Sequence, residues 1–154
     1  MGRMHGKEWG ERYLHLAKEV STWSKDPSTK VGAVAIGDNG EVLTQGFNGF
    51  PRGIKDSSER LKDRDRKYKL VVHAEMNAIY NAGLNGVSLK GSTLYVYGLP
   101  VCNECAKGII QVGIKKVVAM RPADYNKKWD DSIKDAKALF NEAEVMYLID
   151  VEKE

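Results

Sequence analysis

Segments with strand character alternate with segments of helical spacing over the second half of this chain. The runs 92–99, 115–120 and 144–151 are apolar and rich in β-prone residues. Between them, apolar residues recur every three or four positions, which is typical of amphipathic helices at 103–113 and 130–143. Strands joined through helices form parallel neighbours with helices packed on the sheet. The alternation therefore predicts an α/β fold.

The first half of the chain adds a helix, a hairpin and a further helix. Segment 8–24 has a helical apolar stripe, and 30–48 contains two β-prone runs around an Asp-Asn-Gly turn. A polar stretch, 49–69, is either a functional loop or contains a short helix, and 71–84 again has helical character. The stripe of the first helix consists of Trp9, Tyr13, Leu16, Val20 and Trp23.

The predicted elements give five strands and no linker. Residues 1–154 are expected to form a single domain, a three-layer α/β/α sandwich around a five-stranded mixed sheet. The apolar runs are too short to span a bilayer, and the N-terminus lacks the apolar core of a secretory signal. We therefore expect a cytoplasmic protein without a structural disulfide, because the cytoplasm is reducing.

Positive charge is concentrated in one segment. Between Arg52 and Lys69 there are eight Lys or Arg residues against four Asp or Glu, whereas the whole chain carries a net charge of +3. The segment is either a solvated surface loop or a flap that attracts phosphate-bearing ligands. A continuous basic face for long nucleic acid is not evident.

Cys102 and Cys105 are the two cysteines of the chain, and they begin the predicted helix 103–113. A Cys-x-x-Cys pair between a strand and a helix is compatible with a redox dithiol or with half of a metal site. His73 begins another predicted helix after an apolar run. If both helix starts lie at one edge of the sheet, their dipoles favour thiolates there. His73 is therefore the candidate third ligand.

The motif His-x-Glu followed by Cys-x-x-Cys resembles the signature of zinc-dependent nucleobase deaminases. The resemblance implies Zn²⁺ on His73, Cys102 and Cys105, with a fourth position for water. Glu75 is then the group that moves protons between the water, the ring nitrogen and the departing amine. Two further histidines have no such neighbours in the sequence.

Over nearly its whole length the chain is similar to the deoxycytidylate deaminases, some of them phage-encoded. The motifs that carry the resemblance are SKDPSTKVGAV, GFNGFPRG, HAEMNAI and CNECAKGII. It implies a cytidine deaminase-like fold, a cytoplasmic homo-hexamer, and hydrolysis of dCMP to dUMP and ammonia. It also implies activation by dCTP and inhibition by dTTP, with Mg²⁺ on the triphosphate.

The resemblance also suggests residues for substrate and effectors. Asn48 stands at the position of an asparagine that contacts the sugar in that family. The N–H of Ala74 matches the group that holds the pyrimidine carbonyl, and Tyr125 matches an aromatic residue that contacts the substrate. Asn48 is alternatively part of a turn, and Tyr125 alternatively a packing residue. The candidate effector-binding residues are Lys25, Asp26, Lys30, Gly46, Phe47, Gly49 and Arg52.

The chain departs from the family pattern at two positions. Val101 separates Pro100 from Cys102, where relatives have proline next to the cysteine, and Phe47 replaces a common tyrosine. The chain has no spare Cys and His set for a second zinc. Three alternatives stay open: a deaminase for another nucleotide or a nucleic-acid base, a catalytically silent nucleotide-binding module, and a thiol oxidoreductase.

Overall fold

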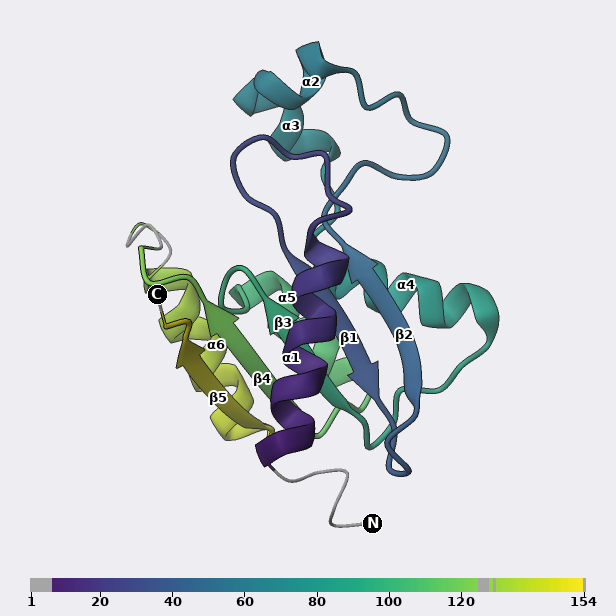
Figure 1. The fold of residues 1–154 in the computed structure, drawn as a ribbon, viewed down its shortest axis with the longest axis vertical. Helices are drawn as coiled ribbons and strands as arrows, with labels where there is room; N and C mark the ends of the chain where they lie inside the picture. The colour runs from purple at the N-terminus through teal and green to yellow at the C-terminus, as the bar shows by residue number, and fades with distance from the viewer. Residues whose placement is uncertain (1–6, 125–127, 129, 154) are drawn as a thin grey trace.

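The computed structural model describes residues 7–124, 128 and 130–153. Its five-stranded sheet has the order β2-β1-β3-β4-β5 (Figure 1). β1 is antiparallel to both of its neighbours, whereas β3, β4 and β5 are parallel to one another. The strands are β1 (Gly32–Ile36), β2 (Val42–Phe47), β3 (Thr93–Tyr97), β4 (Lys116–Arg121) and β5 (Met146–Val151).

Helices cover both faces of this sheet (Figure 1). One cluster of buried apolar side chains lies under α1 (Lys7–Ser21), and a larger one lies between the sheet and α4, α5 and α6. These three helices span Ala74–Asn85, Asn103–Gln111 and Asp130–Glu142. The predicted α/β/α sandwich with a five-stranded mixed sheet is confirmed. Within the described ranges, no helix combines the length and apolar character that a bilayer span requires.

The buried face of α1 contains Tyr13 and Val20 of the predicted stripe, and Trp9 packs against it, but the other two predicted residues differ. Leu16 and Trp23 are exposed, and the helix ends at Ser21, while Ala17 is completely buried. A Cβ atom on Gly32 of β1 would collide with the carbonyl oxygen of Ala17. Small residues at this contact allow α1 to approach β1 closely, beside the large apolar residues Tyr13, Leu14 and Val20 that form the rest of the interface.

The charged stretch 49–69 contains two short helices, α2 (Ser58–Lys62) and α3 (Arg64–Leu70). Each has a side-chain cap, since Ser57 accepts a hydrogen bond from the backbone of Arg60 and Asp63 accepts one from that of Arg66. Figure 1 shows α2 and α3 beyond the end of the sheet, next to the connection between α1 and β1.

Candidate metal and catalytic site

The carboxyl ends of β2 and β3 and the amino end of β1 meet at one edge of the sheet. In the register, Gly32 lies opposite both Phe47 and Tyr97, the last residues of β2 and β3. The chain leaves β3 at this edge and begins α5, whose N-cap is Cys102. α4, whose N-cap is His73, packs against β2 and begins near the same edge. The two predicted helix starts therefore come together.

His73, Cys102 and Cys105 form a compact triad with ligand atoms within 4.8 Å of one another. The His73 Nδ1 atom lies 3.3 Å from the sulfur of Cys105 and 3.5 Å from that of Cys102. Tetrahedral zinc with ordinary bond lengths separates a nitrogen ligand from a sulfur ligand by about 3.6 Å. Both thiols are also free of disulfides. The triad thus fits zinc in donor type and in spacing.

The surroundings of Cys102 favour its thiolate. Its sulfur accepts a hydrogen bond from the Cys105 backbone N–H at 3.4 Å, as the N-cap of α5. Hydrogen bonding by the Cys105 thiol, with a contribution from His73, lowers the pKa of Cys102 to about 4. The same thiol–thiol contact raises the pKa of Cys105. The hydrogen bond with Cys102 raises the pKa of His73.

Glu75 lies in the first turn of α4, two residues after His73, and only 5% of its surface is exposed. Burial, followed by the negative charge of Cys102, raises the pKa of Glu75 to about 7. Ala74 is the first residue of α4 and is fully buried. Its N–H has no partner within the helix, because the first N–H groups of a helix never do. A carboxyl group and a backbone donor therefore stand beside the triad.

These residues open onto a pocket of about 540 Å³. His73, Ala74, Glu75 and Cys102 form part of its lining, whereas Cys105 is buried and does not line it. The remaining lining comes from the α1–β1 connection, α3, the end of β3 and the start of α6. It includes three candidate residues from the sequence, Asp26, Lys30 and Asn48, and also Arg64, Lys67, Tyr68, Tyr97 and Ser132.

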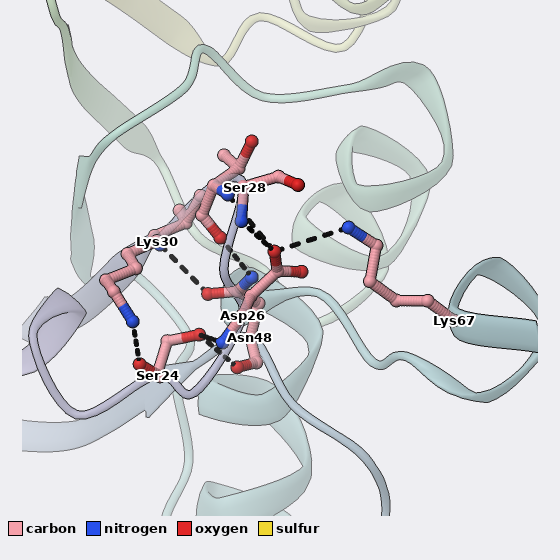
Figure 2. A network of polar contacts seen from close by, with 8 residues as sticks. Ser24, Asp26, Ser28, Lys30, Asn48 and Lys67 are labelled. Atoms are coloured by element: carbon pink, nitrogen blue, oxygen red, sulfur yellow. Dashed lines mark hydrogen bonds and ion pairs between the residues drawn. The ribbon is translucent and has the colours of Figure 1, made fainter. Parts of the chain in front are cut away.

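Asn48 lines this pocket and is hydrogen-bonded to the segment 24–31, as the polar network in Figure 2 shows. Its side-chain oxygen accepts a hydrogen bond from the Val31 N–H at 2.9 Å, and its amide nitrogen donates to the Thr29 carbonyl at 2.9 Å. Its own carbonyl accepts from the Ser24 hydroxyl. An amide NH₂ has two hydrogens, so one donor is left for a ligand. Asn48 thus holds the 24–31 segment in place and keeps one amide hydrogen in addition.

Asp26 is buried within the same network, as Figure 2 shows. Its Oδ1 atom accepts from the backbone N–H groups of Ser28 and Thr29 and from Lys67 Nζ at 3.3 Å. Both members of the Asp26–Lys67 ion pair are more than 90% buried. The pair ties α3 to the α1–β1 connection, and Lys30 joins the network through the carbonyl of Ser24.

The other candidate effector-binding residues lie outside the pocket lining. Lys25 is exposed and pairs with Asp56 at 3.1 Å, and exposed Arg52 donates to Asn81. Phe47 packs edge-on against Trp23. Gly49 pairs with Val72 in an isolated bridge, and Gly46 packs directly against α4. Of the candidate effector-binding residues, Asp26 and Lys30 therefore line the same pocket as His73 and Cys102, and the others do not. Tyr125 lies outside the described residues.

Sequence reasoning did not single out Lys67, Ser132 and Tyr147. Lys67 is one of eight basic residues in its segment, and only packing shows that it is the buried one. Tyr147 lies on β5, where burial raises its pKa above the usual range for tyrosine. Its hydroxyl accepts a hydrogen bond from the Val101 N–H. Val101 is the residue that stands where the resemblance leads one to expect proline.

Known proteins show the same sequence pattern. The family model of the cytidine and deoxycytidylate deaminase zinc-binding region matches residues 7–121. An uncharacterised deaminase of Aliivibrio fischeri is 39% identical over 139 residues, which are 90% of this chain and 90% of that protein. Human deoxycytidylate deaminase is 39% identical over 145 residues, which are 91% of this chain and 78% of that protein.

A solved structure shows the same fold. The crystal structure of dCMP deaminase from the cyanophage S-TIM5, in complex with dCMP and dUMP, has a TM-score of 0.70 at 28% identity. The similarity covers 97% of this chain and 98% of that one. It therefore extends over the triad, the pocket and the C-terminal α6 and β5.

Proposed function

Because the chain belongs to the cytidine and deoxycytidylate deaminase family, we propose that it is a single-domain hydrolase of dCMP. The products are dUMP and ammonia. The observation that carries the proposal is the pocket in which a zinc-type triad, Glu75 and cationic side chains converge. The relatives named for dCMP deamination, one of them solved with dCMP and dUMP, support this substrate.

His73, Cys102 and Cys105 are the residues that would hold zinc, and the metal would supply a Lewis acid that activates water near neutral pH. Glu75 accepts a proton from the attacking water. It passes this proton to the pyrimidine ring nitrogen, then accepts the second proton from the hydroxyl now on the pyrimidine carbon and donates it to the amine, so that the C–N bond breaks, a carbonyl forms and nitrogen leaves as ammonia. A reducing cytoplasm, which we propose as the location, keeps both thiols available.

Backbone and side-chain donors orient the substrate in this proposal. The N–H of Ala74, at the start of α4, donates to the pyrimidine carbonyl oxygen. The remaining N–H of Asn48 donates to the sugar, while its other bonds hold the amide plane still. In this proposal, the fixed side-chain amide of Asn48 determines how far from the triad the sugar is bound.

The charge of the pocket suits a nucleoside monophosphate. Four cationic groups line it against three carboxyl groups, and with the Asp26–Lys67 ion pair set aside three cations remain against two carboxyl groups. A phosphate dianion is attracted to such a wall. The cationic residues are Lys30, Arg64, Lys67 and Lys128, and the carboxyl groups belong to Asp26, Glu75 and Asp124.

An ammonia-release assay tests the substrate. Purified protein is compared on dCMP, deoxycytidine, cytidine, dCTP and a cytosine-containing single-stranded oligonucleotide. We expect the highest kcat/KM on dCMP, because its phosphate dianion is attracted to the cationic groups of the pocket that contains the triad. A higher value on the oligonucleotide or on unphosphorylated deoxycytidine would contradict the proposal.

Regulation is the finer part of the proposal: a homo-hexamer that dCTP, with Mg²⁺, activates and dTTP inhibits. Its support is the family resemblance and the exposed cations Lys25 and Arg52, each held by a surface partner. We expect a sigmoidal dCMP saturation curve that straightens with dCTP. Lys25→Ala should weaken both responses without lowering the zinc content. A hyperbolic curve that millimolar dCTP and dTTP leave unchanged would rule regulation out.

A further inference from the structure

The backbone on both sides of Cys102 is held by hydroxyl groups from the C-terminal part of the chain. The Val101 N–H donates to the hydroxyl of Tyr147 at 2.7 Å. The Asn103 N–H donates to the hydroxyl of Ser132 at 3.1 Å. Cys102 therefore sits between two peptide groups that are each tied to α6 or β5.

Tyr147 is well placed for a rigid contact. Its ring packs on Phe140 in a T-shaped arrangement with centroids 4.9 Å apart, and Phe140 is fully buried. Val101 is also fully buried, so water cannot replace the lost bond if the tyrosine hydroxyl is removed. The bond requires a backbone N–H, which a proline at this position would lack.

Ser132 holds Asn103 through two groups. Besides accepting from the Asn103 N–H, its hydroxyl donates to the Asn103 side-chain oxygen at 2.8 Å. Ser132 lies in the first turn of α6, and Asn103 is the first residue of α5. The contact therefore fixes the start of the helix that carries both cysteines.

We propose that Tyr147 and Ser132 are positioning residues that hold the sulfur of Cys102 in reach of the metal. Cys102 is only half-buried, and its sulfur lies 3.5 Å from His73 Nδ1. A turn of either adjoining peptide plane would move that sulfur relative to His73 and Cys105. Groups behind a metal ligand commonly contribute about 10–100-fold to metal affinity. The inference rests on the proposed zinc site.

Zinc affinity is the direct readout. Purified wild-type protein and variants are stripped of metal and titrated with zinc in competition with a chromogenic chelator of known affinity. Tyr147→Phe removes one hydroxyl and keeps the ring. Tyr13→Phe is the matched control, because the Tyr13 hydroxyl donates to the Gly40 carbonyl at 3.0 Å, and Tyr13 belongs to the core cluster on the opposite face of the sheet.

We expect Tyr147→Phe to bind zinc about tenfold more weakly than the wild type, or weaker still. Tyr13→Phe should lower thermal stability while zinc affinity stays within about twofold of the wild type. Ser132→Ala should also weaken zinc binding, and Ser132→Thr, which keeps the hydroxyl, should restore it. Equal zinc affinities for Tyr147→Phe and wild type, or equal losses for Tyr147→Phe and Tyr13→Phe, would overturn the positioning role.

A double-mutant cycle with Val101→Pro tests whether Tyr147 acts through this one bond. Val101→Pro removes the donor, so Tyr147→Phe should cause little further loss in its background. Additive losses would show that Tyr147 acts in another way. If wild-type protein binds no zinc, the metal site itself fails. If zinc binding follows the expected pattern but dCMP is not deaminated, the proposed reaction fails and the positioning role stands.

Discussion

At the scale of single residues, Glu75 combines burial with a place beside the triad. It has 5% exposure and lines the pocket together with His73 and Cys102. Burying a carboxyl group costs free energy unless the group is hydrogen-bonded or paired with an opposite charge. The proposed reaction uses both states, because one group must accept a proton and later return it. Glu75 is therefore expected to matter for turnover and not for metal binding.

Glu75→Gln keeps the size of the side chain and removes its acid–base function. We expect zinc content and thermal stability close to those of the wild type, with kcat on dCMP lowered by roughly 10²–10⁴-fold or more. Metal analysis and steady-state kinetics on the same preparation check this. A variant that keeps a third of the wild-type kcat would show that another group transfers the proton.

The Asp26–Lys67 pair is the second feature at this scale. Both side chains are more than 90% buried, so either one alone would leave a charge without its partner. We expect Lys67→Ala to lower the free energy of unfolding by about 3 kcal/mol and to raise KM for dCMP. Lys69→Ala, an exposed lysine on the same helix, is the control. Equal denaturation midpoints for the two variants would contradict this role.

Some of the site could be predicted residue by residue. His73, Cys102 and Cys105 stand at predicted helix starts, and local spacing was enough to suggest that they meet. Lys67 and Tyr147 could not be predicted in this way, because their partners Asp26 and Val101 are 41 and 46 residues away. Contacts over such separations depend on how α3 and β5 pack, which local patterns do not encode.

At the scale of elements, the packing of β2 against α4 places His73 and Glu75. A Cβ atom at Gly46 would lie 2.6 Å from the Ala74 carbonyl oxygen and would also collide with the Ala78 N–H. The Thr44 hydroxyl donates to the Ala78 carbonyl at 2.8 Å in the same interface. The sequence suggested Gly46 as an effector-binding residue, whereas its contact with α4 shows that a glycine is needed here for packing.

Gly46→Ala should push β2 and α4 apart. We expect a loss of about 1–3 kcal/mol in the free energy of unfolding, typical of overpacking. Gly83→Ala, on the exposed side of α4 with no atom within 4 Å of a new Cβ, is the matched control. It should stabilise the protein by roughly 0.5–1 kcal/mol. Chemical denaturation of both variants checks the sign of each effect, and a neutral Gly46→Ala would contradict the close packing.

The sequence predicts most of the helices and strands correctly, and the exceptions are α2, α3 and part of the buried face of α1. The segments with a clear helical or strand pattern of apolar residues form α4, α5, α6 and the five strands. The two short helices at 58–70 begin after the side-chain caps Ser57 and Asp63 and are too short to show an apolar periodicity. On α1, Tyr13 and Val20 are buried as predicted, whereas the close contact of Ala17 with Gly32 cannot be seen in a pattern of large apolar residues.

At the scale of the whole molecule, the sheet order brings distant segments to one pocket. The strand order β2-β1-β3-β4-β5 puts β3, which leads to the cysteines, next to β1. β2, which leads through the charged segment to His73, lies on the other side of β1. Strand character predicted the five strands and the mixed sheet, but the order needs contacts between the two halves of the chain.

The most direct test of the central claim is a zinc titration of metal-stripped protein, followed by dCMP turnover at each point. If His73, Cys102 and Cys105 hold one catalytic zinc, activity should rise linearly and level off at one zinc per chain. Cys105→Ser should show no such endpoint. Full dCMP turnover by the stripped protein, or no turnover with one zinc bound, would contradict the account.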